Sequence, residues 1–184
     1  MDTDERRNGF TIWMTGLPGS GKSTLADLLK ARLEIDSGKL VEILDGDEIR
    51  KGLSRDLGLS KEHREEHARR VSFVAKILSR NGVISIVALI SPYRASRQSA
   101  KETIGAERFV EVYVQASLQE CERRDPKGLY AKARRGEITN MTGIQDPFEE
   151  PLNPDITVNT EEVAPDVTAG LILGELRKQG RLTS

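Results

Sequence analysis

Eight residues near the start of the chain have the types and spacing of a loop that binds the phosphates of a nucleotide. Residues 16–23 read Gly-Leu-Pro-Gly-Ser-Gly-Lys-Ser and match the pattern G-x-x-x-x-G-K-[ST]. Glycines let the backbone curl until successive N–H groups point at one anion. Lys22 can reach the β- and γ-phosphates as a mobile charge, and the Ser23 hydroxyl can bind Mg²⁺. The alternative is a glycine-rich turn that only caps a helix. The residues expected to contact the nucleotide are Gly16, Gly19, Ser20, Gly21, Lys22, Ser23 and Thr24.

Further polar side chains follow two predicted strands. Asp45 and Asp47 come after the strand at 40–44, and Ser91 comes after the strand at 83–90. Ligands of open α/β sheets bind beyond the carboxyl ends of the strands, so these side chains should converge with the phosphate-binding loop. A simple Asp-Gly turn is the alternative for 45–47. Because no Asp ends the strand at 83–90 and no guanine-reading Asn/Thr-Lys-x-Asp motif occurs, the pattern favours a small-molecule kinase.

Alternating apolar runs and amphipathic segments must position these residues. Leu25, Leu28, Leu29 and Leu33 form one stripe of a helix that begins near Ser23. The alternation predicts an α/β fold, a nucleotide-kinase-like three-layer sandwich with a central, mostly parallel five-stranded sheet and helices on both faces. The predicted strands are 10–15, 40–44, 83–90, 109–115 and 156–158. The other predicted helices are 60–80, 96–104, 118–124 and 167–178.

Residues 126–154 interrupt this alternation. They contain four of the seven prolines and little periodicity. Residues 123–135 carry six basic side chains against one acidic one, and residues 145–166 carry seven acidic side chains and no basic one. A solvated loop could have this composition, but we favour an arginine-bearing lid over about 123–150 that closes on anionic phosphates. The expected organisation is a flexible tail at 1–8 and a single domain at 9–184.

Composition excludes several other classes of protein. The 28 basic and 29 acidic residues balance, which argues against a nucleic-acid-binding protein, and the single Cys121 excludes a disulfide framework. We expect Cys121 to be a small buried apolar residue. No apolar run is long enough to cross a membrane and residues 1–8 do not resemble a signal peptide, so a cytoplasmic location is expected. His63 and His67 match the H-x-x-E-H zinc pattern, but an exposed, charged helix start is the expected interpretation.

Five segments together resemble the adenylylsulfate kinase (APS kinase) family. They are GLPGSGKST at 16–24, LDGDEIRKGLSRDLGLS at 44–60, ISPYR at 90–94, CERRDPKGLYAKARRGEI at 121–138 and TGIQDPFEEP at 142–151. The resemblance implies phosphorylation by ATP of the 3′-hydroxyl of adenosine 5′-phosphosulfate (APS), which gives 3′-phosphoadenosine 5′-phosphosulfate (PAPS), with Mg²⁺ as cofactor. It also implies a homodimer and a functional link to ATP sulfurylase.

The resemblance also implies roles for individual residues. Asp47 would lie beside the acceptor hydroxyl as base or orienting group, Asp45 would organise Mg²⁺, and Arg124 would lie near the ATP adenine. Arg50 and Arg64 would hold the phosphosulfate, a task that suits guanidinium groups because they donate two parallel hydrogen bonds. The implied catalytic residues are Asp47, Lys22 and Ser91, and we expect direct in-line transfer without a phosphorylated serine. The implied acceptor site comprises Asp47, Arg50, Leu59, Arg64, His67, Ile90, Ser91, Lys127, Asn140 and Met141.

Three residues depart from the family pattern, all in the implied acceptor site. Leu59 and Met141 stand where phenylalanines usually sandwich the APS adenine, and His67 stands in place of an asparagine. Leu and Met can pack on a purine by dispersion but lose aromatic stacking, about 1 kcal/mol per ring. One alternative is therefore a kinase of the same fold that acts on another nucleotide anhydride. A further alternative, of a different class, is a non-catalytic nucleotide-binding regulatory domain.

Overall fold

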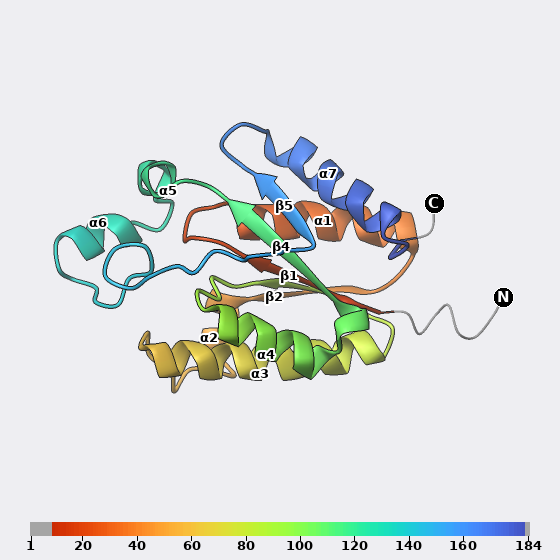
Figure 1. Ribbon diagram of the computed structural model, residues 1–184, viewed down its shortest axis with the longest axis horizontal. Helices are drawn as coiled ribbons and strands as arrows, with labels where there is room; N and C mark the ends of the chain where they lie inside the picture. The colour runs from red at the N-terminus through yellow and green to blue at the C-terminus, as the bar shows by residue number, and fades with distance from the viewer. Residues whose placement is uncertain (1–8, 183–184) are drawn as a thin grey trace.

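A five-stranded sheet lies at the centre of the molecule (Figure 1). The structure is a computed structural model that describes residues 9–182, and the tail expected at 1–8 lies outside the described residues. The strands are β1 (Thr11–Thr15), β2 (Val41–Asp45), β3 (Ile84–Ala88), β4 (Phe109–Gln115) and β5 (Ile156–Asn159). They are ordered β2-β3-β1-β4-β5, and every pairing between them is parallel. The predicted parallel sheet is confirmed.

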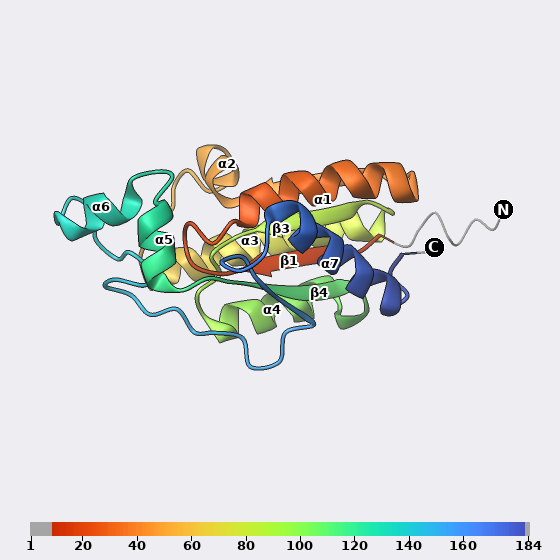
Figure 2. The ribbon, with the colours of Figure 1, turned by 90° about the horizontal axis from the view of Figure 1, so that it is seen from above.

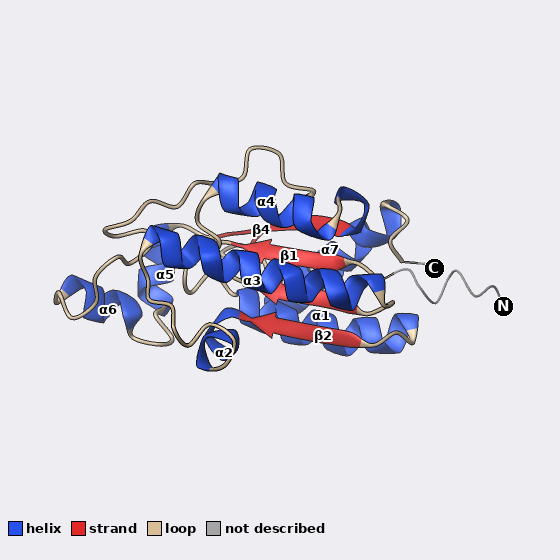
Figure 3. Ribbon diagram, turned by 90° about the horizontal axis from the view of Figure 1, so that it is seen from below, coloured by secondary structure: helices blue, strands red, loops and turns tan. Residues whose placement is uncertain are grey.

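Helices cover both faces of the sheet. Helices α1 (Lys22–Ser37) and α7 (Pro165–Lys178) pack on one face, and α3 (Lys61–Arg80) and α4 (Arg94–Ile104) pack on the other (Figures 1 and 3). Each face has its own apolar core, because the buried strands present apolar side chains in both directions. The three-layer sandwich is confirmed. A 3₁₀ turn, η2 (Ala106–Arg108), precedes β4.

The predicted helical stripes contact these cores. Leu25, Leu29 and Leu33 of α1 are fully buried against the sheet, and Leu28 packs at the edge of the same core. At the start of α3 the Ser60 hydroxyl accepts a hydrogen bond from the His63 N–H, which confirms Ser60 as the N-cap. The spacing of apolar residues and the capping chemistry are therefore sufficient to locate the long helices.

Two short helices lie where the sequence predicts none. Helix α2 (Gly46–Lys51) replaces the simple turn after β2, because the Asp45 carboxylate accepts hydrogen bonds from the Asp47 and Glu48 N–H groups and so caps a helix. Helix α6 (Leu129–Arg134) lies inside the segment expected to be irregular. The Asp125 carboxylate starts it by accepting from the Tyr130 and Ala131 N–H groups.

Helices α2, α5 (Leu118–Arg124) and α6 gather at one end of the molecule (Figure 2). The carboxyl ends of the parallel strands lie at this same end of the molecule, so these helices can contribute side chains to a site there. No helix in residues 9–182 is both long enough and apolar enough to cross a membrane.

Candidate functional site

The carboxyl ends of the strands open into a cavity of about 810 Å³. Its lining comes from the loop after β1, from α2, from the inner face of α3, from the loop after β3, and from residues 120–130 and 160–165. The structure brings most of the predicted site residues together on this cavity. They are Gly19, Gly21, Lys22, Ser23, Thr24, Asp45, Asp47, Arg50, Arg64, His67, Ile90, Ser91, Arg124 and Lys127.

The phosphate-binding loop has the curled backbone that the motif predicts. Gly19 and Gly21 have φ angles of 80° and 98°, in the region that favours glycine. Gly16 and Ser20 do not line the cavity, because they form the packed side of the loop. A Cβ at Gly16 would lie 2.4 Å from the Val114 carbonyl oxygen and 2.8 Å from the Ser20 Oγ. Glycine at position 16 is therefore required for the shape of the loop, and the buried Ser20 Oγ accepts a hydrogen bond from Lys22 rather than facing the cavity.

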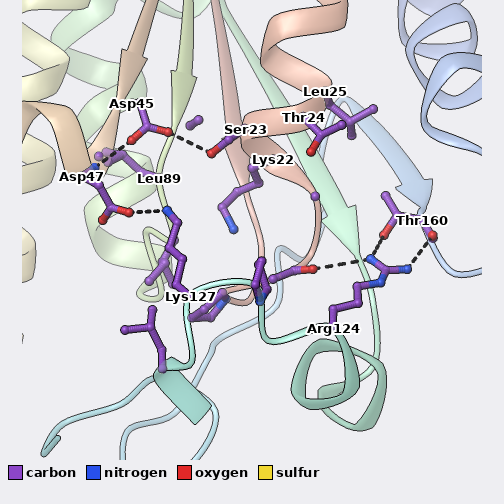
Figure 4. A pocket seen from close by; sticks show the side chains of 18 of the residues that line it. Lys22, Ser23, Thr24, Leu25, Asp45, Asp47, Leu89, Arg124, Lys127 and Thr160 are labelled. Atoms are coloured by element: carbon purple, nitrogen blue, oxygen red, sulfur yellow. Dashed lines mark hydrogen bonds and ion pairs between the residues drawn. The ribbon is translucent and has the colours of Figure 1, made fainter. Parts of the chain in front are cut away.

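Lys22 points into the space enclosed by this loop (Figure 4). It is only 8% exposed, and its Nζ donates to the carbonyl oxygens of Gly16 and Leu17, both at 2.8 Å, and to the Ser20 Oγ at 3.3 Å. Burial, with a smaller contribution from the nearby Lys127 charge, lowers the pKa of Lys22 to about 8. An anion at this loop would favour the charged form of the lysine.

Ser23 and Asp45 form an oxygen-rich pair at the edge of the loop. The Ser23 Oγ donates to the Asp45 Oδ2 at 2.8 Å (Figure 4), while the Asp45 Oδ1 caps α2. Hydroxyl and carboxylate oxygens are the ligands that Mg²⁺ prefers, so these residues fit that ion. The described residues contain no group of three or more His, Cys, Asp or Glu side chains that could hold a metal. A magnesium ion here would therefore depend on phosphate oxygens and water for its remaining positions.

Asp47 and Lys127 meet across the cavity. Lys127 lies between α5 and α6, and its Nζ forms an ion pair with the Asp47 Oδ2 (Figure 4). The hydrogen bond that Lys127 donates to the Asp47 carboxylate raises the pKa of Lys127. Both side chains are more than half exposed, at 62% for Asp47 and 55% for Lys127, so solvent screens the pair and it can be exchanged for other partners.

Arg50 and Arg64 line the cavity beside this pair. Arg50 donates to the carbonyl oxygen of Gly58 at 3.0 Å, and Arg64 donates through Nε to that of Leu59 at 2.9 Å and through Nη2 to that of Asn140 at 2.7 Å. Burial lowers the pKa of both arginines. A guanidinium has five N–H donors, so each arginine keeps donors that can serve an anionic ligand.

Leu59, Asn140 and Met141 do not line the cavity, contrary to expectation. Leu59 and Asn140 present their backbone carbonyls to Arg64, so they hold that side chain in place. The Leu59 side chain is 39% exposed, and Met141 is buried in an apolar cluster with Cys121, Tyr130 and Ala133 under α5 and α6. Met141 lies there because its unbranched apolar side chain fills the core of this small subdomain.

The two histidines differ in environment. His63 is exposed, as expected, and its Nδ1 accepts from the Gly58 N–H at 2.9 Å. For His67 the expectation of an exposed helix start is wrong. It is 5% exposed, lines the cavity, and neither ring nitrogen has a hydrogen-bond partner among the described residues. Burial and the charge of Arg50 lower the pKa of His67 to about 4, so its ring is neutral near pH 7.

Thr160 is a cavity residue that the sequence reasoning missed. Arg124 donates through Nη1 to the Thr160 Oγ1 at 3.0 Å and through Nη2 to the Thr160 carbonyl oxygen at 2.7 Å (Figure 4). The Thr160 Oγ1 in turn donates to the Ser20 carbonyl oxygen at 2.9 Å, which connects α5 to the phosphate-binding loop. Its position directly after β5, at the edge of the sheet where ligands bind, is a signal that could have identified it.

A phosphate-binding loop between β1 and α1 of a parallel sheet, facing a carboxylate and two guanidinium groups across one cavity, defines a P-loop kinase. A sugar kinase from Janibacter has this fold, with a TM-score of 0.64 at 18% identity. The model of the family described as adenylylsulphate kinase matches residues 8–159, and the chain belongs to that family.

Relatives and solved structures agree with this assignment. A probable adenylyl-sulfate kinase of Pyrococcus abyssi is 53% identical over 95% of this chain and 98% of its own length, and an adenylyl-sulfate kinase of Halothermothrix orenii is 49% identical over 95% and 92%. The structure of the Mycobacterium tuberculosis APS kinase CysC in complex with AMPPNP and APS superposes with a TM-score of 0.89. It is 44% identical, and the match covers 92% of this chain and 98% of that one.

Proposed function

We propose that this protein transfers the γ-phosphoryl group of ATP to the 3′-hydroxyl of adenosine 5′-phosphosulfate, giving ADP and PAPS. The observation that carries the proposal is that one cavity joins the phosphate-binding loop to Asp47, Arg50 and Arg64. The mycobacterial APS kinase, which has the same fold over 92% of this chain, was solved with AMPPNP and APS together.

On the ATP side, the backbone N–H groups of the loop at 16–23 and the N-terminus of α1 bind the phosphates. Lys22 leaves its carbonyl partners to contact the β- and γ-phosphates, and Arg124 with Thr160 lines the part of the cavity that takes the nucleoside. Ser23 and Asp45 would hold Mg²⁺ with the phosphates. When bound, this ion neutralises negative charge that develops on the phosphate oxygens.

On the acceptor side, Asp47 orients the 3′-hydroxyl and accepts its proton. The hydroxyl oxygen forms a bond to the γ-phosphorus as the bond from that phosphorus to the β–γ bridging oxygen breaks, and ADP leaves. Arg50 and Arg64 bind the phosphosulfate with the N–H groups that face the cavity. Lys127, which pairs with Asp47 here, is placed to move to an acceptor oxygen when the hydroxyl takes its position. Ile90, Ser91 and His67 complete the acceptor side. No covalent intermediate on Ser91 is required, because in-line transfer needs positioning and charge stabilisation.

Other parts of the sequence-based hypothesis belong to the same proposal. They are a single domain at 9–184 with residues 123–150 as its lid, a homodimer, a cytoplasmic location and a functional link to ATP sulfurylase. Among the solved relatives, a hexameric APS kinase from Thiobacillus denitrificans is 36% identical, and this chain spans 31% of its length.

Purified protein with Mg-ATP and APS tests the function directly. We expect ADP and PAPS in equal amounts, and no product above background from Lys22→Ala. ADP or AMP offered in place of APS tests a kinase for another nucleotide. If ADP or AMP were turned over faster than APS, that nucleotide and not APS would be the acceptor. No transfer to any acceptor would support a non-catalytic nucleotide-binding protein.

A further inference from the structure

Arg97 of α4 is a buried arginine whose N–H groups reach three separate segments. It is 3% exposed, its Nη1 donates to the Ser91 carbonyl oxygen at 2.6 Å, and its Nη2 donates to the Glu149 carbonyl oxygen at 2.7 Å. Its Nε donates to the Glu111 Oε1 on β4 at 2.8 Å. Arg97 is not one of the described residues that line the cavity, so any effect it has on the reaction must pass through the groups it holds.

The first of those groups belongs to a strained part of the cavity wall. Ser91 has a φ of 43°, a left-handed conformation that a residue with a Cβ adopts at a cost and keeps only where its surroundings hold it. The Trp13 Nε1 donates to the Ser91 Oγ at 3.1 Å, and the Thr15 Oγ1 donates to the Ile90 carbonyl oxygen at 2.7 Å. Because Ile90 and Ser91 line the cavity, these hydrogen bonds determine the shape of its acceptor side.

The second group lies at the end of the segment predicted to be a lid. The Glu149 N–H donates to the Pro92 carbonyl oxygen at 2.8 Å, beside the strained serine. The neighbouring Phe148 ring stacks on Tyr113, with ring centroids 6.0 Å apart, and lies 5.9 Å from the Arg97 guanidinium. Arg97 thus donates both to the acceptor-side loop and to the chain that returns from α6.

The third group explains why an arginine stands here. The Glu111 carboxylate compensates the buried positive charge and fixes the Nε side of the guanidinium plane, which leaves Nη1 and Nη2 aimed at the two carbonyls. Burial raises the pKa of Glu111, and the positive charge of Arg97 opposes that shift. A lysine could supply the charge but not three donors fixed in one plane.

We propose that Arg97 is a positioning residue for the acceptor nucleotide, holding the Ile90–Ser91 backbone in its strained conformation and joining it to the end of the lid segment. The proposal rests on the function proposed above. It extends the acceptor site to a residue that contacts no substrate. It predicts that a change of Arg97 alters the KM for APS much more than the KM for ATP.

Arg97→Lys tests this, with Arg94→Lys as the matched control. Arg94 is exposed on the same helix and its Nε donates to the Glu150 carbonyl oxygen at 2.7 Å, but its guanidinium does not donate to Ser91. We expect Arg97→Lys to raise the KM for APS about tenfold and to leave the KM for ATP within about twofold, because the phosphate-binding loop keeps its own contacts. Arg94→Lys should change neither KM.

Trp13 provides a measurement that does not depend on turnover. It is the only tryptophan of the chain, it is fully buried, and its indole N–H donates to Ser91. Its fluorescence emission should therefore shift in Arg97→Lys and not in Arg94→Lys. This signal is read in the absence of substrate, so it distinguishes failure of this inference from failure of the proposed function, which wild-type turnover of APS tests.

Several outcomes would overturn the inference. An equal rise of both KM values, a KM for APS that stays unchanged despite a lower Tm, or an unshifted Trp13 emission would each assign Arg97 a structural role alone. If Arg97→Lys does not fold, Arg97→Gln, whose planar amide can still donate to one carbonyl, is measured in the same way. Failure of both variants to fold would also count against a positioning role.

Discussion

The two sides of the cavity are built on different principles. The phosphate-binding part of the ATP side comes from one continuous segment, residues 16–24, whose groups are largely backbone N–H groups, together with a lysine that is almost fully buried. The acceptor side is assembled from α2, α3, the loop after β3 and the segment between α5 and α6. Its central pair, Asp47 and Lys127, is more than half exposed.

This difference indicates how each side meets its ligand. Backbone groups fixed by the fold need little reorganisation, so the phosphate-binding loop is prepared for ATP before it binds. Exposed side chains must exchange their present partners for the ligand, and ordering each one costs about 0.5–1.5 kcal/mol. We therefore expect acceptor-side substitutions to act on APS and on the chemical step, and ATP binding to be insensitive to them.

Asp47→Asn should give the largest effect and tests whether the two sides are separable. An amide cannot accept the hydroxyl proton, so we expect kcat to fall about 10²- to 10⁴-fold. The ATP dissociation constant, measured by calorimetry, should stay within about twofold. Glu48→Gln is the matched control, because Glu48 is the next acidic residue on α2 and does not line the cavity. Loss of ATP affinity in Asp47→Asn would mean that the carboxylate serves the ATP side.

Arg64→Lys should give the next largest effect. Lysine cannot donate at once to the Leu59 and Asn140 carbonyls and to a phosphosulfate, so we expect the KM for APS to rise about 10- to 100-fold with little change in the KM for ATP. Steady-state kinetics with each substrate varied in turn measures both constants. Arg69→Lys is the control, because Arg69 lies on the exposed side of α3 and pairs with Glu66. An equal rise in the KM for ATP would contradict the claim that the ATP side and the acceptor side bind their ligands independently.

The same difference explains what could be predicted from the sequence. The strands are short apolar runs, and the three central ones, β1, β3 and β4, are buried on both faces, so the strand ends were located to within one or two residues. Helices α2 and α6 are only six residues long, and each begins where an aspartate caps N–H groups, so neither has a periodic pattern to detect. The phosphate-binding loop is contiguous and therefore visible as a motif.

The residues that were missed act through backbone carbonyls. Thr160 meets Arg124 across 36 positions of the chain, and Arg97 meets Glu149 across 52. A bond to a carbonyl imposes no residue type on the acceptor, so the partner leaves no trace in the sequence. The sequence also does not show in which part of the molecule an apolar side chain is buried. Met141 and Cys121 lie in one apolar cluster, and the expectation of a buried apolar role is confirmed for Cys121, whereas Met141 was expected on the acceptor.

Met141→Phe and Leu59→Phe sharpen this last point. If Met141 belongs to the core under α5 and α6, a phenylalanine overpacks that core and costs about 1–3 kcal/mol, which lowers Tm by several degrees. Leu59 is partly exposed, so Leu59→Phe should change stability by less than about 0.5 kcal/mol. Thermal unfolding and the KM for APS are measured on both variants. A lower KM for APS with unchanged Tm in Met141→Phe would indicate that Met141 contacts the acceptor, as expected from the sequence.

His67 should give the smallest effect, visible as a pH dependence of stability. Its pKa in the folded protein is about 4, below the ordinary value of 6.5, so between these values the unfolded chain binds more protons than the folded one. The stability that comes from the neutral ring is complete above about pH 6.5 and is lost as the pH falls toward 4. Each tenfold difference in proton affinity corresponds to about 1.4 kcal/mol.

Urea unfolding of wild type and His67→Asn at about pH 5 and pH 7.5 measures this contribution. Because asparagine does not titrate, the variant should lose less stability than wild type over this interval, whatever its absolute stability. His63→Asn is the control, since His63 is the other histidine of the chain and its side chain is exposed. This result would show that the acceptor side contains a buried, neutral histidine ring that can donate a hydrogen bond and that ATP binding does not need. If His67→Asn and wild type lose the same stability, the ring of His67 is solvated, and the acceptor side is more open than the burial of this residue indicates.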